Sequence, residues 1–241
     1  MIFYIGTHMV NHAHAFSHSF ISANRLWKRK SHFAVNNWIM DSGAFSEISK
    51  YGRFRHSLQE YADLINRFAD CGSLECAVTQ DMMCEPFIVK KTGLSVKEHQ
   101  RVTIERYDEL IKLTAVPIMP VIQGFAPAEY LVHLLQYGDR LKEGMRVGVG
   151  SICKRNAKPT QIEHILSILK DARPDLRLHG FGLKITALKN DRILSLLYSA
   201  DSMAWSYRAR MQGGNANGKE EAVQFKKYIE TMPIQGMLGI L

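Results

Sequence analysis

Residues 118–149 read IMPVIQGFAPAEYLVHLLQYGDRLKEGMRVGV, in which two short apolar runs flank a longer run with helical spacing. The runs Ile118–Ile122 and Arg146–Val149 have the length of buried strands, whereas Ala128–Leu135 repeats its apolar positions with the period of an α-helix. A helix between two buried strands is the crossover that joins parallel strands. This stretch therefore predicts one strand–helix–strand unit of a parallel sheet.

The same alternation continues in both directions along the chain. Six or seven such units in 241 residues predict an α/β fold, a (β/α)8 barrel of the TIM type that forms a single domain over residues 1–241 and allows for an irregular N-terminus. A doubly wound open sheet is the alternative. The other predicted strands are Ile2–Ile5, Trp38–Met40, Cys76–Thr79, Leu176–Phe181 and Ser202–Trp205, and the other predicted helices are Leu58–Phe68, Val96–Leu113, Ile162–Leu169, Asp191–Leu197 and Ala222–Ile229.

The composition is that of a globular protein with an excess of positive charge. Lys and Arg number 31 against 23 Asp and Glu, which gives a net charge of +8. This excess favours an anionic partner such as nucleic acid, and a basic enzyme without such a partner is the alternative. We find no apolar run as long as a membrane span and no signal peptide. The four cysteines, Cys71, Cys76, Cys84 and Cys153, form no CxxC pair and are predicted to be reduced in a cytoplasmic protein.

Polar residues and glycines follow five of the predicted strands. In a parallel barrel the carboxyl ends of the strands converge on one face, where active sites lie. A single residue of this kind is more often a helix N-cap, but its repetition at several strand ends indicates a site. The segments are Asp41-Ser42-Gly43, Gln80-Asp81, Gln123-Gly124, Gly148–Ser151 and Gly180–Gly182.

Three aspartates in or beside apolar runs are the candidate catalytic residues: Asp41, Asp81 and Asp201. A carboxylate near a core is unfavourable unless it is paired, hydrogen-bonded or protonated, so such positions are often functional, with structural capping as the alternative. Two carboxylates that face one sugar can divide glycosyl transfer between attack on the anomeric carbon and proton transfer.

Glycines and basic residues surround the predicted site. Gly148 and Gly150 leave room for a flat ligand at the backbone, or they form a tight strand-to-helix turn. Cations near the predicted site face suit a phosphate backbone, whereas a solvated helix face is the alternative. The candidate nucleic-acid-binding residues are Arg25, Lys28, Arg29, Lys30, Lys154, Arg155, Arg208 and Arg210, together with Lys184.

Four histidines near the N-terminus raise the question of a metal site. His8 and His12, or His14 and His18, would share one face of a helix at four-residue spacing. No carboxylate joins them at close spacing and HEXXH is absent, so we predict no metal and expect a polar loop near the nucleic acid instead.

Five segments together resemble the tRNA-guanine transglycosylase superfamily, and most closely its DpdA branch, which places 7-deazaguanines in the DNA of phages and bacteria. The resemblance extends from about Ile39 to Arg210 and rests on the order and spacing of the segments. DSGAF departs from the family's DSGGF in that Ala44 replaces a glycine. The segments are DSGAF (41–45), QDMMCEP (80–86), VIQGF (121–125), VGVGS (147–151) and ADSMAWSYRAR (200–210).

The resemblance implies a role for each matching residue. Asp201 corresponds to the nucleophile, and Asp41 corresponds to the aspartate that transfers protons and contacts the base. Asp81 corresponds to the residue that recognises the guanine edge, and Gln123 to the one that contacts the base carbonyl. The remaining positions would seat the base or let backbone groups approach it, and they are Ser42, Gly43, Gly148 and Gly150.

The implied activity is exchange of guanine in DNA for a 7-deazaguanine such as 7-cyano-7-deazaguanine, through a covalent aspartyl-glycosyl intermediate. The incoming base is a co-substrate, and no metal or redox cofactor is required. The target nucleotide must leave the helical stack, and Phe45 or Trp205 would stack on it unless they belong to the core. Two successive inversions would give net retention.

Two departures from the tRNA enzymes favour DNA over tRNA. No cysteine follows Cys153, so the zinc site of three Cys and one His is missing, and the chain ends about 30 residues after Arg210, so we expect no appended RNA-binding domain. The alternatives are a tRNA-directed enzyme, a non-catalytic nucleic-acid-binding barrel and an unrelated metal-dependent hydrolase that uses the histidines. The sequence leaves the oligomeric state open.

Overall fold

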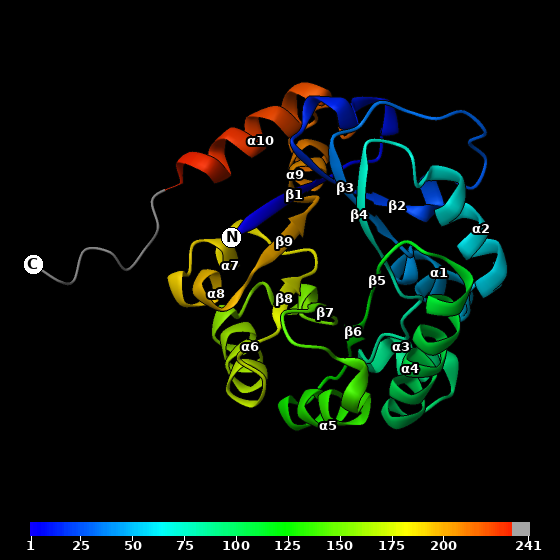
Figure 1. Ribbon diagram of the computed structural model, residues 1–241. Coiled ribbons are helices and arrows are strands. Elements are labelled where there is room, and N and C mark those ends of the chain that lie inside the picture. The colour runs from blue at the N-terminus through cyan, green and yellow to red at the C-terminus, as the bar shows by residue number, and fades with distance from the viewer. Residues whose placement is uncertain (233–241) are drawn as a thin grey trace, which may run out of the picture.

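The strands of the computed structural model form a parallel barrel with the helices around its outside (Figure 1). The structure describes residues 1–232, so residues 233–241 of the predicted domain lie outside the described part. Within residues 1–232, nine parallel strand segments form one sheet in the order β5-β4-β3-β2-β1-β9-β8-β7-β6. They are β1 (Ile2–Gly6), β2 (His18–Ser22), β3 (Asn37–Asp41), β4 (Ser73–Val78), β5 (Ile118–Met119), β6 (Val121–Ile122), β7 (Arg146–Val149), β8 (Arg177–Gly180) and β9 (Ser199–Ser202).

The sheet closes through Pro120, which separates β5 from β6. A proline has no backbone N–H to donate to a ladder, so the predicted strand Ile118–Ile122 is interrupted there. The carbonyl of Pro120 still accepts from Gly148 N at 2.8 Å, while Met119 O accepts from Thr79 N on the other side at 3.1 Å. Counted as one strand, β5 and β6 complete an eight-stranded barrel, which confirms the predicted fold and excludes the doubly wound sheet.

Alternate residues of the strands fill the barrel interior. Tyr4, Phe20, Ile39, Val78 and Val121 form a buried apolar cluster, and each comes from a different strand. Their sequence neighbours point outward and pack against the helices, because successive side chains of a strand face opposite sides. The interior is therefore a packed core, and any cavity must lie at the end of the barrel.

Six helices occupy the ranges that apolar spacing predicts. Two match to the residue, and Ser57 and Ser95 begin them with capping boxes. Four other short α-helices in the described residues were not predicted, because one or two turns show little periodicity; they are α1 (Ala44–Tyr51), α3 (Pro86–Thr92), α7 (Ile185–Leu188) and α9 (Ala204–Met211). The predicted helices are α2 (Leu58–Phe68), α4 (Val96–Leu113), α5 (Pro127–Tyr137), α6 (Pro159–Ala172), α8 (Asp191–Leu196) and α10 (Lys219–Thr231).

The first two units of the barrel are irregular, as predicted. The strands β1 and β2 are followed by the short 3-10 helices η1 (Val10–Ala15) and η2 (Ala23–Arg25) instead of α-helices. The helix α10 fills the vacant position: its Phe225 packs with Ile5 of β1 and Phe16 after η1 (Figure 1). The C-terminal helix thus completes the N-terminal side of the barrel.

Two strand predictions are corrected. The strand β2 was missed, because its sequence HSFIS carries only two apolar residues. The strand predicted at Ser202–Trp205 is wrong: β9 ends at Ser202, whose hydroxyl accepts from Ala204 N at 3.1 Å as α9 begins. No helix in the described part of the chain is long and apolar enough to cross a membrane.

Candidate active site

A cavity of about 450 Å³ opens at the carboxyl ends of the strands. Each of the eight strands, or the loop directly after it, contributes to its wall, and its volume lies within the ~300–1,000 Å³ typical of small-molecule sites. The lining residues include one from each strand or its loop: Thr7, Ser22, Asp41, Asp81, Gln123, Gly150, Phe181 and Asp201. Residues as far apart in the sequence as Thr7 and Met203, which are 196 positions apart, thus share one wall.

The alternation along the strands explains why these residues face inward. Asp41 lies two residues after the interior residue Ile39, and Gln123 lies two residues after Val121. Phe181 follows the buried His179 in the same way. The polar residues therefore form the last interior layer, directly above the apolar core.

Asp41 ends β3 and is half-buried at the cavity wall. Burial and then the negative charge of Asp201 raise the pKa of Asp41 to about 6, while hydrogen bonds from the Ser22 side chain and the Gly43 backbone act in the opposite direction. A carboxyl group with a pKa this close to neutrality can both give and take a proton under physiological conditions.

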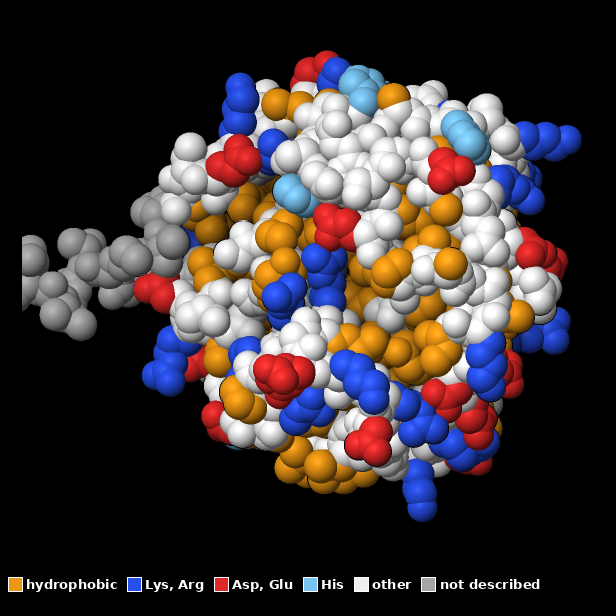
Figure 2. Space-filling view, in the orientation of Figure 1, with side chains coloured by type: hydrophobic (Ala, Val, Ile, Leu, Met, Phe, Trp, Pro, Cys, Tyr) orange, Lys and Arg blue, Asp and Glu red, His pale blue; other side chains and the backbone are white. Residues whose placement is uncertain are grey.

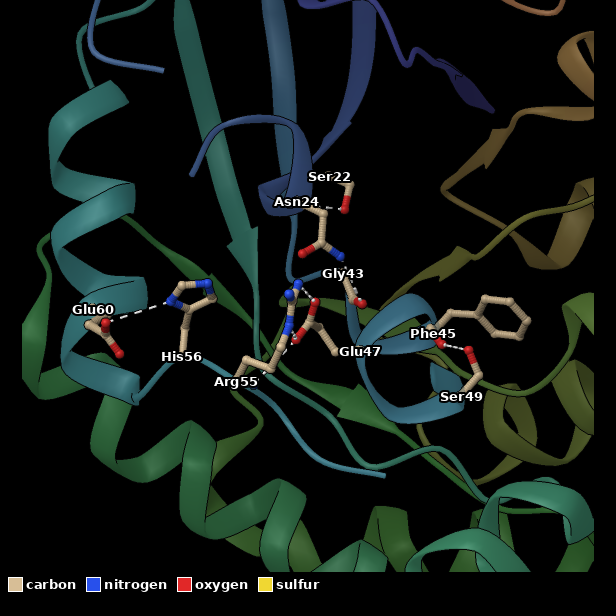
Figure 3. A network of polar contacts seen from close by, with 9 residues as sticks. All are labelled: Ser22, Asn24, Gly43, Phe45, Glu47, Ser49, Arg55, His56 and Glu60. Atoms are coloured by element: carbon tan, nitrogen blue, oxygen red, sulfur yellow. Dashed lines mark hydrogen bonds and ion pairs between the residues drawn. The ribbon is translucent and has the colours of Figure 1, made fainter. Parts of the chain in front are cut away.

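The turn after Asp41 is held by the network of Figure 3. Asn24 Nδ2 donates to the carbonyl of Gly43 at 3.4 Å, and a Cβ at Gly43 would lie 2.3 Å from that nitrogen. Gly43 also has φ +78°, which favours glycine. Further along α1, the buried carboxylate of Glu47 accepts from the guanidinium of Arg55 at 2.6 and 2.9 Å. These contacts fix the position of Asp41 relative to η2 and α1.

Asp81, Gln123 and Ser151 form a chain of hydrogen bonds along the cavity wall. The amide nitrogen of Gln123 donates to Asp81 Oδ2, and the hydroxyl of Ser151 donates to Gln123 Oε1 at 2.9 Å. Burial raises the pKa of Asp81 to about 7; the hydrogen bond from Gln123 opposes this, and the Asp41 charge adds to it. A carboxyl and an amide held side by side in this way present donors and acceptors in a fixed arrangement to a planar ligand.

The position of Gln123 is fixed by three further contacts. Its backbone N–H donates to His133 Nδ1 at 2.7 Å, and its carbonyl accepts from Gln100 Nε2 at 2.8 Å. Its side chain lies against Gly150, where a Cβ would come within 2.2 Å of the amide. Gly150 is therefore required for Gln123 to reach Asp81.

Asp201 lies at the third position of β9 and is close enough to Asp41 to raise the pKa of that carboxyl. Its Oδ1 accepts from the backbone N–H of Gly182 at 3.0 Å, and His179 Nε2 is 3.4 Å from the same oxygen. His179 Nδ1 is in turn 2.9 Å from the hydroxyl of Ser199, and burial lowers the pKa of His179. The carboxylate is thus held from one side and is free to meet a ligand on the other.

The chain matches the model of the protein family described as DpdA, DeoxyPurine in DNA protein A, over residues 1–222. This match covers all nine strand segments and the first part of α10. The chain belongs to this family. The membership identifies a DNA-modifying transglycosylase and confirms the family resemblance of the sequence. No curated protein matches the chain.

In this DpdA family member, the aromatic candidates have different environments. Trp205 belongs to the core, because it is buried and its Nε1 donates to Gly6 O at 2.8 Å. Phe45 is exposed at the cavity rim. Phe20 and Phe181, which the sequence did not single out, line the cavity, and the ring of Phe20 stacks on His179 with 5.5 Å between the ring centres.

Three of the predicted substrate-binding residues support the cavity wall from behind. Ser42 is buried, and its hydroxyl has no hydrogen-bond partner among residues 1–232. Gly43 forms the turn beside it, and Gly148 lies under the ring of Phe181, where a Cβ would approach within 2.4 Å. None of the three is among the described residues that line the cavity. Their roles in substrate binding remain predictions.

The predicted basic residues separate into three groups. Arg25 lines the cavity, Lys154 and Arg155 line a second hollow next to it, and Arg210 is close enough to His8 to lower the pKa of that histidine. The guanidinium of Arg29 donates to the backbone carbonyls of Ser31 and His32 in its own loop, whereas Lys28 and Lys30 are exposed. Arg208 lies elsewhere, on a shallow hollow between α9 and α10. Lys and Arg side chains are spread over the face seen in Figure 2 and are mixed with acidic ones.

Glu85 is a functional candidate that sequence reasoning missed, although it lies in the segment QDMMCEP. It lines the cavity, is only 2 % exposed, and has neither carboxylate oxygen hydrogen-bonded among the described residues. Burial raises the pKa of Glu85. The Glu-Pro pair at the start of a helix looks like an ordinary N-terminus, which is why this signal is weak in the sequence.

The four N-terminal histidines do not share a helix. His12 and His14 lie in η1, whereas His18 begins β2 and His8 precedes η1. His8 lines the cavity, where its Nδ1 is 2.9 Å from a guanidinium nitrogen of Arg25. Residues 1–232 contain no group of three or more His, Cys, Asp or Glu side chains arranged to hold a metal ion.

Proposed function

We propose that this chain exchanges a guanine base of DNA for a 7-deazaguanine base, such as 7-cyano-7-deazaguanine, through a covalent intermediate on Asp201. The observation that carries the proposal is the opening of Asp41, Asp81, Asp201 and Gln123 into one cavity. Family membership indicates DNA as the substrate and transglycosylation as the reaction type, while the four side chains offer a nucleophile, a proton donor and groups that can bind a base.

In the first half of the reaction, a carboxylate oxygen of Asp201 attacks C1′ of the deoxyribose of an extruded guanosine. The bond from C1′ to N9 breaks, and the protonated carboxyl of Asp41 gives its proton to the departing base. The negative charge of Asp201 raises the pKa of Asp41. When Asp201 becomes an ester it loses its negative charge, so the pKa of Asp41 falls as Asp41 donates its proton.

In the second half, N9 of the incoming 7-deazaguanine attacks C1′ from the face that guanine left. Asp41, now a carboxylate, accepts the proton from N9, and the ester bond breaks to restore the carboxylate of Asp201. Each displacement inverts C1′, so the configuration is retained overall. The recovered charge on Asp201 raises the pKa of Asp41 again, which favours the protonated form for the next turnover.

Asp81 and Gln123 recognise the base in this proposal. The carboxyl of Asp81 accepts from the N–H groups of the guanine edge, and the remaining N–H of Gln123 donates to the base carbonyl. Both 7-deazaguanine and guanine carry this edge, so one pair of side chains serves both halves of the reaction. Phe181 and Phe20 in the cavity wall offer apolar surface to the ring.

The test is incubation of the protein with labelled 7-cyano-7-deazaguanine and either DNA or tRNA. We expect label in DNA, and a protein–DNA adduct that survives denaturation when the incoming base is omitted. Asp201→Asn should abolish both signals without loss of the fold. Label in tRNA alone would make this a tRNA enzyme, and label in neither polymer would favour a non-catalytic nucleic-acid-binding barrel.

A further inference from the structure

A second hollow, of about 420 Å³, lies next to the active-site cavity. Glu85 lines both, so the two spaces share a wall. The hollow is formed by the start of α3, the loop after β6 and the segment from η4 (Cys153–Arg155) to the start of α6. All three segments follow carboxyl ends of strands, which makes the hollow a lateral extension of the active-site face. We call it the flanking groove.

Two exposed phenylalanines form apolar walls of the flanking groove. Phe87 is 47 % exposed and Phe125 is 39 % exposed. Each has a cation near its ring: Lys154 Nζ is 5.6 Å from the ring centre of Phe87, and the guanidinium carbon of Arg155 is 4.7 Å from that of Phe125. Exposed aromatic rings beside cations are the combination on which proteins stack the bases of single-stranded nucleic acids.

The charge of the flanking groove favours an anion. Lys154, Arg155 and Lys158 line it, and among the described lining residues Glu85 is the single acid. Lys154 also reaches the cavity rim, where its Nζ lies 4.4 Å from the ring centre of Phe45. A cation shared by the two hollows is in position to contact the phosphate between two consecutive nucleotides.

Unsatisfied polar atoms point to a ligand with its own hydrogen-bonding groups. Both carboxylate oxygens of Glu85, and Nε of Arg155, are buried without a hydrogen-bond partner among residues 1–232. A buried polar group without a hydrogen-bond partner is unfavourable unless a bound ligand supplies that partner. An aromatic platform, cations and a buried acceptor match the ring, the phosphate and the N–H edge of a nucleotide.

We propose that the flanking groove binds an unpaired nucleotide next to the target in the same DNA strand. Its base stacks on Phe87 or Phe125, its edge donates to Glu85, and its phosphate contacts Lys154 or Lys158. The inference rests on the proposed function, which places the target base in the adjoining cavity. Extrusion of the target breaks the stack on both sides of it, and the groove replaces the stacking that one neighbour loses.

The experiment is a double-mutant cycle in which one change is made in the protein and the other in the DNA. Binding affinity for short single-stranded oligonucleotides is measured by fluorescence anisotropy. The neighbour on the 5′ or the 3′ side of the target guanine is either intact or abasic. We expect wild-type affinity to fall about tenfold when one of these neighbours is made abasic. The variant with both Phe87→Ala and Phe125→Ala should bind the intact strand about tenfold more weakly and lose little more with the abasic strand.

Two control variants separate stacking from general effects. Phe87→Tyr with Phe125→Tyr retains the rings and should keep the tenfold discrimination. Tyr51→Ala removes another exposed ring with cations nearby, Lys50 Nζ at 5.1 Å and Arg55 at 4.2 Å, but Tyr51 lines neither hollow. It should bind like wild type.

The outcomes distinguish the two proposals. If the double alanine variant still loses affinity tenfold on the abasic strand, the flanking groove does not bind the neighbour, even when the wild type exchanges bases in DNA. If the coupling is present but no polymer gains labelled base, the groove inference stands and the proposed exchange reaction is wrong. Equal effects of Tyr51→Ala and of the groove variant would also overturn the inference.

Discussion

Asp41 is the residue at which burial and a neighbouring charge combine. Burial alone would raise its pKa, and the charge of Asp201 raises it further, to about 6. The proposed mechanism depends on the second contribution, because only a charge that disappears during the reaction can change the proton affinity of Asp41 at the right step. This coupling can be measured without turnover.

We predict that Asp201→Asn lowers the pKa of Asp41. The asparagine is neutral, so it mimics the esterified state and removes the charge repulsion that favours the protonated form. The carbon resonance of the Asp41 carboxyl, followed by NMR over a pH series, would report the shift. Asp175→Asn changes a surface aspartate paired with Arg173 and should leave that pKa unchanged. An identical titration of Asp41 in wild type and Asp201→Asn would contradict the coupling.

Gly150 tests whether the placement of Gln123 matters. The backbone conformation of Gly150 is one that any residue can adopt, but an added Cβ would lie 2.2–2.5 Å from the Gln123 amide. We predict that Gly150→Ala displaces that amide from Asp81 and lowers kcat/KM for exchange at least tenfold. Gly214→Ala, whose Cβ would meet only ordinary contacts of 3.4–3.7 Å, is the matched control. Undiminished exchange in Gly150→Ala would show that Gln123 has no required position.

At the scale of elements, the sequence predicted the parts of the fold that carry strong periodicity. The helices α2 and α4 were predicted to the residue, because each carries a long amphipathic pattern, and in the structure a capping serine begins each of them. The strand β2 was not predicted, because only two of its five residues are apolar, and the end of β9 was not, since β9 pairs with β1 at the other end of the chain.

For the site, the strand-end pattern predicted that Asp41, Asp81 and Gln123 lie together, and all three line the cavity, because parallel strands bring their carboxyl ends together. Asp201 was singled out by its adjacent apolar run and by the family resemblance, and it lies in the same cavity wall near the end of β9. The pattern could not show which side chains support the wall from behind, as Ser42 does, because that depends on the local path of the turn. Glu85 was missed because a Glu-Pro pair looks like an ordinary helix N-terminus, and the sequence does not show that its side chain is buried.

The helix α10 takes the place of a helix that the N-terminal units lack. Loss of its contacts with the core should therefore lower the stability of the fold. Phe225 is 5 % exposed and packs against residues of β1, η1 and α9. We predict that Phe225→Ala lowers the free energy of unfolding by about 3–5 kcal/mol, as measured by urea denaturation. Tyr228→Ala, on the exposed side of the same helix at 37 %, should change it much less. Equal effects of the two substitutions would show that α10 does not complete the core.

The loop after η2 contains a cation that is hydrogen-bonded within the protein and two cations that are exposed to solvent. Arg29 donates to Asn11 Oδ1, Ser31 O and His32 O, so it stabilises the loop, whereas Lys28 and Lys30 are exposed. We predict that Lys28→Ala with Lys30→Ala flattens the slope of log affinity for duplex DNA against log salt by up to about 1.8, or ~0.9 per lost phosphate contact. The preference for guanine should persist. An unchanged slope would mean that these lysines are only solvated.

At the scale of the whole molecule, a chain with a net charge of +8 encloses three acidic side chains with raised pKa at the mouth of its barrel. In the proposed reaction, the positive charge outside attracts a polyanion, whereas the acidic groups inside contact the N–H edge of a base and the anomeric carbon of a sugar. We therefore expect the cavity to favour a neutral base over a phosphate group, because a phosphate group would face carboxylates there. Buried carboxylates of this kind also make the stability of the fold depend on pH.

We predict that Asp81→Asn becomes progressively more stable than wild type as pH rises from about 4 to about 7. In the native state Asp81 holds its proton up to a pKa of about 7, whereas in the unfolded chain it releases the proton near 3.8. Between these values the native state binds more protons, so the free energy of unfolding of the wild type falls with rising pH by up to about 4 kcal/mol. Asparagine does not titrate. Histidines with lowered pKa, such as His133 at about 4, have the opposite effect, but both proteins contain them and they cancel in the difference. Urea denaturation of both proteins across this range measures the difference, and one that stays constant with pH would mean that Asp81 is ionised in the folded protein throughout.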